Sequence, residues 1–183
     1  MQRELVVRAQ GGDVDAFASL AGAAIDRLHG VALRILGDRD AADDAVQRAL
    51  IDAWDHLGGL REPERFDAWT YRLVVRAAYK EIRRERSQRG RVVFITPGDG
   101  SQRDLGADLA ERDAIERGFR RLSPEHRAVL VLHHYADLPL SQIAEILDLP
   151  VGTVGSRLHY AAREMRAALE RESRGALAAG AIR

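Results

Sequence analysis

Basic side chains crowd one stretch of the chain in a pattern that favours binding to phosphate. Residues 76 to 91 contain seven Lys or Arg residues and only two Glu residues. The cationic members are Arg76, Lys80, Arg83, Arg84, Arg86, Arg89 and Arg91. Lys and Arg neutralise nucleic-acid phosphates and displace their counterions, so the run predicts a sequence-independent, salt-sensitive contact with a nucleic acid. An ordinary solvated helix face is the alternative interpretation of such a run.

An acidic run lies earlier in the chain. Residues 38 to 55 contain six Asp residues and two Arg residues, whereas the whole chain has 28 basic and 28 acidic residues and no net charge. The acidic members are Asp38, Asp40, Asp43, Asp44, Asp52 and Asp55. An acidic helix beside a basic helix in one domain predicts two surfaces with different partners. The net charge of zero then results because the charges of these two surfaces cancel.

A third functional pattern is LSQIAEILDLPVGTVGSRLHYAAREM, residues 140 to 165, which predicts a helix-turn-helix. Its first helix turns Leu140, Ile143, Ala144 and Leu147 inward, with a small residue at 144 because the second helix crosses closely there. Asp148 stands at the turn position that favours a left-handed backbone, which Asp tolerates.

The second helix of this motif begins after Pro150, and its first turns would carry the DNA-reading side chains. The candidate residues for base recognition are Thr153, Gly155, Ser156, Arg157, His159, Tyr160 and Arg163. An ordinary helical hairpin would pack similarly, but the small residue, the turn and the spacing together favour DNA binding.

Catalytic or metal-binding chemistry is the least favoured class of function. Neighbouring helical residues point about 100° apart, so His133 and His134 do not form the i, i+4 pair of a metal site. Asp43 and Asp44 point in different directions from their helix, and no nucleophile lies near them, so they do not form a catalytic carboxylate pair. The chain has no cysteine, which excludes a disulfide framework, a thiolate zinc site and a cysteine nucleophile. We expect a protein that is not an enzyme and that has no metal or cofactor.

The elements that position these groups are predicted to be helices. Apolar residues make up 46% of the chain but aromatic residues only 5%, which favours helix packing through Leu, Ala, Val and Ile. Apolar spacing predicts helices at about 13–36, 40–57, 64–87, 108–121 and 124–136, before the helix-turn-helix. Asp13 and Ser123 are predicted N-caps, and Gly37 a predicted helix stop. No membrane span or signal peptide is recognisable, so we expect a soluble, cytoplasmic, all-α protein.

A change of composition divides the chain into two helical domains joined by a flexible linker. Residues 87 to 108 hold four glycines and a Pro-Gly pair, as linkers do. Within them, VVFIT is either a docked segment or a short strand. The predicted boundaries are 10–88 for the first domain, 89–107 for the linker, 108–172 for the second domain and 173–183 for a flexible tail.

Four motifs in order resemble the sigma-70 family of RNA polymerase initiation factors, specifically its extracytoplasmic-function (ECF) group. GDVDAFASL resembles the opening helix of the group, and LRILGDRDAADDAVQRALIDAW resembles its regions 2.1 and 2.2. RFDAWTYRLVVRAAYKEIRRERSQR resembles regions 2.3 and 2.4, and LSPEHRAVLVLHHYADLPLSQIAEILDLPVGTVGSRLHYAAREM resembles region 4. The resemblance covers most of residues 10 to 170.

The resemblance implies a transcription initiation factor that binds core RNA polymerase and selects promoters. It assigns docking on the clamp helices of the largest subunit to Asp43, Asp44, Gln47 and Arg48. The loop 58–67 and the next helix would capture the unwound −10 strand, with one base flipped into a pocket. The residues assigned to this strand are Arg61, Arg65, Phe66, Arg76, Lys80, Arg83, Arg84 and Arg86.

For the second domain, the resemblance implies −35 recognition in the major groove by the helix-turn-helix, and contact of the helices near Glu125 to His134 with the polymerase flap. An anti-sigma factor is a further expected partner. Four residues depart from the family pattern. Arg76 stands where the family usually has asparagine, and Lys80 stands where it often has an acidic residue. Gly155 and Tyr160 stand at positions that are usually basic. The base preferences of the family therefore do not transfer to this chain.

Two other functions remain open at this point. One is a polymerase-binding or protein-binding adaptor that does not select promoters, against which the basic residues Arg83, Arg84 and Arg86 argue. The other is a regulator with a sensory N-terminal domain and a helix-turn-helix, which leaves the acidic and basic helices unexplained.

Overall fold

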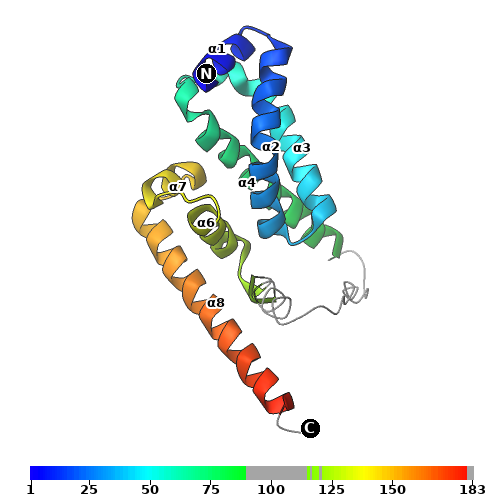
Figure 1. Ribbon diagram of the computed structural model, residues 1–183, viewed down its shortest axis with the longest axis vertical. Coiled ribbons are helices and arrows are strands. Elements are labelled where there is room, and N and C mark those ends of the chain that lie inside the picture. Colours follow the sequence, from blue (N-terminus) through cyan, green and yellow to red (C-terminus); the bar gives the residue numbers. More distant parts are fainter. Residues whose placement is uncertain (90–114, 116, 120, 181–183) are drawn as a thin grey trace.

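The computed structural model describes residues 1–89, 115, 117–119 and 121–180 (Figure 1). The predicted linker at 89–107, with its VVFIT segment, lies outside the described residues except at position 89. Most of the helix predicted at 108–121 also lies outside them. All regular elements of the described residues are helical, as the sequence predicted, and none of these helices is long and apolar enough to cross a bilayer.

Seven α-helices and two 3₁₀ turns are described. They are α1 (Gln2–Gln10), α2 (Val14–Leu36), α3 (Arg39–His56), η1 (Leu57–Gly59), η2 (Pro63–Arg65), α4 (Phe66–Arg89), α6 (Pro124–His134), α7 (Leu140–Leu147) and α8 (Val151–Gly180). The sequence predicted the described helices from α2 to α7, and the start of α8, to within a few residues, but it did not predict α1. Helix α8 continues to Gly180, into the segment 173–183 that was predicted to be a flexible tail.

Local signals in the sequence determine where these helices begin and end. The Asp13 carboxylate accepts a hydrogen bond from the backbone N–H of Ala16 at 2.9 Å, and the Ser123 hydroxyl accepts one from the N–H of His126 at 3.2 Å. These are N-caps, which satisfy donors that the first turn leaves free. Gly37 ends α2 with φ 73°, and Asp148 separates α7 from α8 with φ 57°. All four predictions are confirmed.

The N-terminal half is a bundle in which α2, α3 and α4 pack on one another, with α1 across one end (Figure 1). Helix α3 contributes mainly alanines to this bundle. Small side chains allow helix axes to approach closely, so α3 lies tightly against both α2 and α4. The buried residues of α3 are Ala42, Ala45, Val46, Ala49 and Ala53. This packing aligns the acidic and basic helices side by side.

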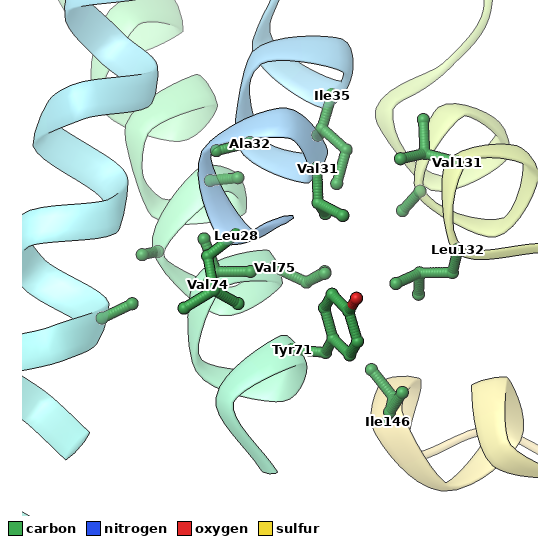
Figure 2. Packing of buried hydrophobic residues seen from close by; sticks show 14 of the residues in the cluster. Leu28, Val31, Ala32, Ile35, Tyr71, Val74, Val75, Val131, Leu132 and Ile146 are labelled. Atoms are coloured by element: carbon green, nitrogen blue, oxygen red, sulfur yellow. The ribbon is translucent and has the colours of Figure 1, made fainter. Parts of the chain in front are cut away.

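The two halves of the molecule share one hydrophobic core. Helix α6 packs on α2 and α7 packs on α4, and buried residues continue across the boundary without interruption. Figure 2 shows Tyr71 of α4 beside Leu132 of α6 and Ile146 of α7. This contact was not predictable from the sequence, since apolar periodicity shows which face of a helix is buried but not which helix covers it.

Polar contacts reinforce the same boundary. The guanidinium of Arg127 in α6 donates to the backbone carbonyl of Ile35 at the end of α2, at 2.8 Å. The guanidinium carbon of Arg34 lies 3.7 Å from the ring centroid of Tyr135, a cation–π contact. A Cβ at Gly30 would lie 2.0 Å from the Tyr135 hydroxyl. Only glycine permits this close approach of the ring to α2.

Candidate nucleic-acid interface

Three basic residues form an exposed stripe along α4. Arg76, Lys80 and Arg83 follow one another at spacings of four and three residues, which places them on one side of the helix. All three are exposed, and within the described residues none of them has a hydrogen bond or an ion pair. We call these three residues the α4 stripe. Their charges are available to an external anion.

The α4 stripe borders a small pocket at the junction with α3. The pocket has a volume of about 190 Å³, and Arg76 and Lys80 of α4 line it together with Arg48 and Asp52 of α3. Its polar groups are three cations and one carboxylate, so it offers several donors and an acceptor close together. The two α4 residues that depart from the family pattern therefore lie at the same site.

Other predicted DNA-binding cations are already engaged within the molecule. Arg84 pairs with Glu81 at 3.5 Å. Arg65 pairs with Glu62 at 2.7 Å and, across the boundary between the halves, with Glu145 of α7 at 2.8 Å. Both pairs of Arg65 are exposed, and the Arg84 side chain is exposed although Glu81 is largely covered, so each pair is weak and exchangeable. They nevertheless distinguish these residues from the α4 stripe.

Arg86 lies in the electrostatic environment of α6. Burial opposes ionisation of Glu125, yet its pKa is lowered by its own backbone N–H, by the Ser123 hydroxyl and by the charges of Arg157 and Arg86. The pKa of Arg127 is lowered by burial first and then by repulsion from Arg86. Arg86 therefore faces charges of the second half as well as solvent.

Phe66 does not present a surface for a DNA strand. The sequence assigned it to the −10 strand, but its side chain is 1% exposed and packs among the residues that surround the end of α1. Its first-turn position in α4 directs the ring under the preceding loop. Among the residues of this loop with a predicted role, Arg61 and Arg65 remain exposed.

The outward face of α8 carries different chemistry. Ser156, His159, Tyr160 and Arg163 are exposed there, with Tyr160 at 47%. The guanidinium carbon of Arg163 lies 5.1 Å from the ring centroid of Tyr160. Within residues 153–163 this face therefore offers one cation, an aromatic ring and several polar groups, which can contact base edges in a groove.

Thr153, Gly155 and Arg157 are half-buried at the margins of this face. Arg157 lies towards α4 and α6, because its charge acts on both Tyr79 and Glu125. Burial raises the pKa of the Tyr79 hydroxyl to about 12; Glu125 adds to that shift and Arg157 opposes it. Arg157 therefore faces the boundary between the halves more than its neighbours do.

The four residues assigned to polymerase docking lie on two sides of α3. Asp43 and Gln47 line a groove of about 680 Å³ between α2 and α3, where the Asp43 carboxylate lies 3.0 Å from His29 Nε2. Arg48 lies on the other side, where it pairs with Glu81 and with Asp44 at 3.3 Å. The hydrogen bond that the Arg48 guanidinium donates to the Glu81 carboxylate raises the pKa of Arg48. Arg48 thus joins α3 to α4.

Exposed apolar groups accompany the acidic surface of α3. The Trp54 side chain is 38% exposed, and its ring packs edge-on against Phe17 at 5.0 Å between centroids. Ile51, one turn earlier, is also exposed. Large exposed apolar side chains are typical of protein-binding surfaces. In the second half, α6 and α8 border an open groove of about 760 Å³, lined by Leu130, Met165 and Leu169 and by polar residues that include His134 and Arg166.

Both halves match models of a known family. Residues 20–88 match Sigma-70 region 2, and residues 118–167 match Sigma-70 region 4. The ECF RNA polymerase sigma factor SigL of Mycobacterium tuberculosis is 36% identical over 146 residues, which cover 76% of this chain and 80% of SigL. SigW of Bacillus subtilis is 27% identical over 91% of this chain and 95% of its own length. The chain belongs to the ECF sigma factors of RNA polymerase. It is a transcription initiation factor that directs polymerase to promoters.

Solved structures share the fold of this sigma factor. CnrH, solved in complex with the cytosolic domain of CnrY, superimposes with a TM-score of 0.71 at 23% identity over 93% of this chain and 97% of CnrH. RpoE of Bartonella quintana, solved with the anti-sigma factor NepR, gives a TM-score of 0.67 at 21% identity over 86% of this chain and 98% of RpoE.

Proposed function

We propose that three surfaces of this sigma factor divide the work of initiation. The groove at Asp43 and Gln47 docks on the polymerase clamp, the α4 stripe and the loop before it hold the −10 strand, and the outward face of α8 enters the −35 major groove. The α4 stripe is the observation that carries this proposal. Three exposed cations on one helix face, without internal partners in the described residues, are what a phosphate backbone requires.

The arrangement favours promoter selection over an adaptor role. An adaptor would need only the α3 surface, whereas here the helix-turn-helix and the α4 stripe are both presented. The proposed roles involve binding alone, so we infer a protein that is not an enzyme. Because it acts with polymerase on chromosomal DNA, we infer that it works in the cytoplasm.

An anti-sigma factor is the second proposed partner. CnrH was solved with CnrY and the Bartonella RpoE with NepR, and both have the fold of this chain. The apolar groove between α6 and α8 supports a protein contact in the second half, because its wall includes Leu130, Met165 and Leu169. We propose that the polymerase flap and an anti-sigma segment compete for this groove.

Reconstitution with core polymerase tests the proposed function. The full-length protein, added to core enzyme, is expected to initiate at a limited set of genomic promoters that share −10 and −35 sequences. Asp43→Arg is expected to weaken association with core enzyme at least tenfold by reversing charge at the groove. Asp55→Arg makes the same charge change at an exposed position about 120° further around α3, and is expected to bind normally.

Two outcomes would contradict the proposal. Equal loss of core binding in both variants would show that net charge, and not the groove, drives association. Normal core binding without any promoter preference would favour the adaptor.

A further inference from the structure

One side chain of α1 closes the turn that precedes α4. Nε2 of Gln10 donates to the backbone carbonyls of Leu57 at 3.1 Å and Leu60 at 2.7 Å. A glutamine amide has two N–H donors, so one side chain satisfies both carbonyls. Leu60 also donates its N–H to the Leu57 carbonyl at 3.0 Å. Gln10 therefore binds both ends of η1.

The turn needs such a restraint because of its composition. Gly58 and Gly59 occupy its middle, and consecutive glycines have more backbone freedom than any other pair. A Cβ at either position would meet no atom within 4 Å, so no neighbouring side chain packs against the middle of the turn. The hydrogen bonds at its two ends thus determine its shape.

Helix α1 also contacts the chain on both sides of this turn. Its buried residues Val6 and Ala9 lie in a small core with Leu57, at the start of the turn, and Phe66, at the start of α4. At the surface, Arg3 pairs with Glu64 at 2.7 Å, and the Gln2 amide donates to Asp67 at 2.7 Å. Helix α1 therefore spans the whole connection from α3 to α4.

The connection carries the exposed residues Arg61 and Arg65, which the proposed function places on the −10 strand. A loop that is ordered before binding loses less conformational entropy when the strand arrives, so it binds more tightly. It also holds each guanidinium in one orientation, in which it can meet a particular base edge and not only a phosphate, so a cognate strand gains more than a scrambled one. We propose that Gln10 is a positioning residue for −10 recognition: it holds residues 57–65 in the conformation that presents Arg61 and Arg65. This inference rests on the proposed function of the loop.

The test compares two premelted templates that share a −35 element and differ only in their −10 strand, one cognate and one scrambled. Transcription by core polymerase with the full-length factor is measured on both. The wild type is expected to prefer the cognate template. Gln10→Met keeps the length of the side chain but removes its donors, and is expected to reduce the preference about fivefold. Transcription from the scrambled template is expected to stay unchanged.

Glu4→Ala is the matched control on the same helix. Glu4 is exposed and within the described residues has no hydrogen bond or ion pair, so the preference should remain that of the wild type. Gln10→Ala provides a second variant that removes the donors without adding a thioether, and it should behave as Gln10→Met does. Melting temperature and core binding are measured for all variants and are expected to change little.

The outcomes separate the inference from the proposed function. An unchanged preference in both Gln10 variants, or an equal loss on both templates, would overturn the positioning role while leaving −10 recognition intact. A wild type that transcribes both templates equally would overturn −10 recognition itself, and the positioning role with it. A selective loss of preference supports both.

Discussion

The α4 stripe and the outward face of α8 are two exposed helix surfaces with opposite chemistry. Arg76, Lys80 and Arg83 give α4 three cations within eight residues, whereas residues 153–163 of α8 expose one cation, Arg163, beside Tyr160. Cations bind any phosphate, while hydroxyls, rings and small side chains depend on which base edge they meet. This difference supports the proposal that α4 supplies salt-dependent affinity and α8 supplies sequence discrimination.

The same comparison explains how a chain without net charge can bind DNA. Many of its cations pair internally, as Arg84 does with Glu81 and Arg65 with Glu145. Three cations without an internal partner in the described residues lie together on one face of α4. Local charge, and not the total, therefore determines the interaction with phosphate.

The largest effect is expected when two of the three cations of the α4 stripe are removed. Arg76→Ala combined with Lys80→Ala should lower the slope of log affinity against log salt by about 1.4 to 1.8, and weaken promoter binding by polymerase about 15- to 30-fold at ~0.15 M salt. Filter binding or anisotropy over a salt series measures both. Both residues are exposed, so the free energy of unfolding should not change.

Arg84→Ala is the control for this prediction. It removes a cation of the same helix that Glu81 already neutralises in part. The decrease in the salt slope should therefore be less than half of the decrease in the double variant. An equal decrease in the salt slope for each cation removed would show that paired and unpaired cations contribute alike to DNA binding.

A smaller, sequence-dependent effect is expected from α8. Tyr160→Ala should reduce −35-dependent transcription about tenfold, since one base contact is worth roughly 1–3 kcal/mol. Core binding and the salt slope should persist, which separates α8 from α4. Tyr160→Phe distinguishes the hydroxyl from the ring. Unchanged transcription in the alanine variant would show that another face of α8 meets the DNA.

A gain of about two- to threefold is expected when a paired cation is released. Glu145→Gln removes the carboxylate that holds Arg65 across the boundary, while Glu62 remains. Affinity of the polymerase complex for −10 single strands should rise, and the salt slope should rise by less than one. Asp40→Asn makes the same change of charge at an exposed site at the start of α3, the end of that helix remote from the loop. An equal gain in both variants would indicate a general effect of net charge.

The smallest expected effect concerns the stability of α8. A Cβ at Gly155 meets no atom within 4 Å, so Gly155→Ala should raise the free energy of unfolding by about 0.5–1 kcal/mol through helix propensity alone. Ala167→Gly, at an exposed position of the same helix, should lower it by a similar amount. Denaturant titration measures both. A loss of stability in Gly155→Ala would contradict the open surroundings of this residue.

The local structure of this protein was largely predictable from its sequence. Asp13, Gly37, Ser123 and Asp148 were identified as caps and turns, because each acts through its own backbone or that of the next few residues. The pattern of the helix-turn-helix was recognisable for the same reason. Helix α1 was missed because it is only nine residues long and contains charged residues, so it shows little apolar periodicity.

The sequence by itself determined the helices, their ends and the order of charged segments, because these depend on interactions within a few residues. Only the tertiary structure decided which charges are free, that Phe66 is buried and Trp54 is partly exposed, and that one core joins both halves. Those features depend on which helix covers which face. Contacts such as Arg65 with Glu145 link residues 80 positions apart, and local sequence patterns contain no information about such distances.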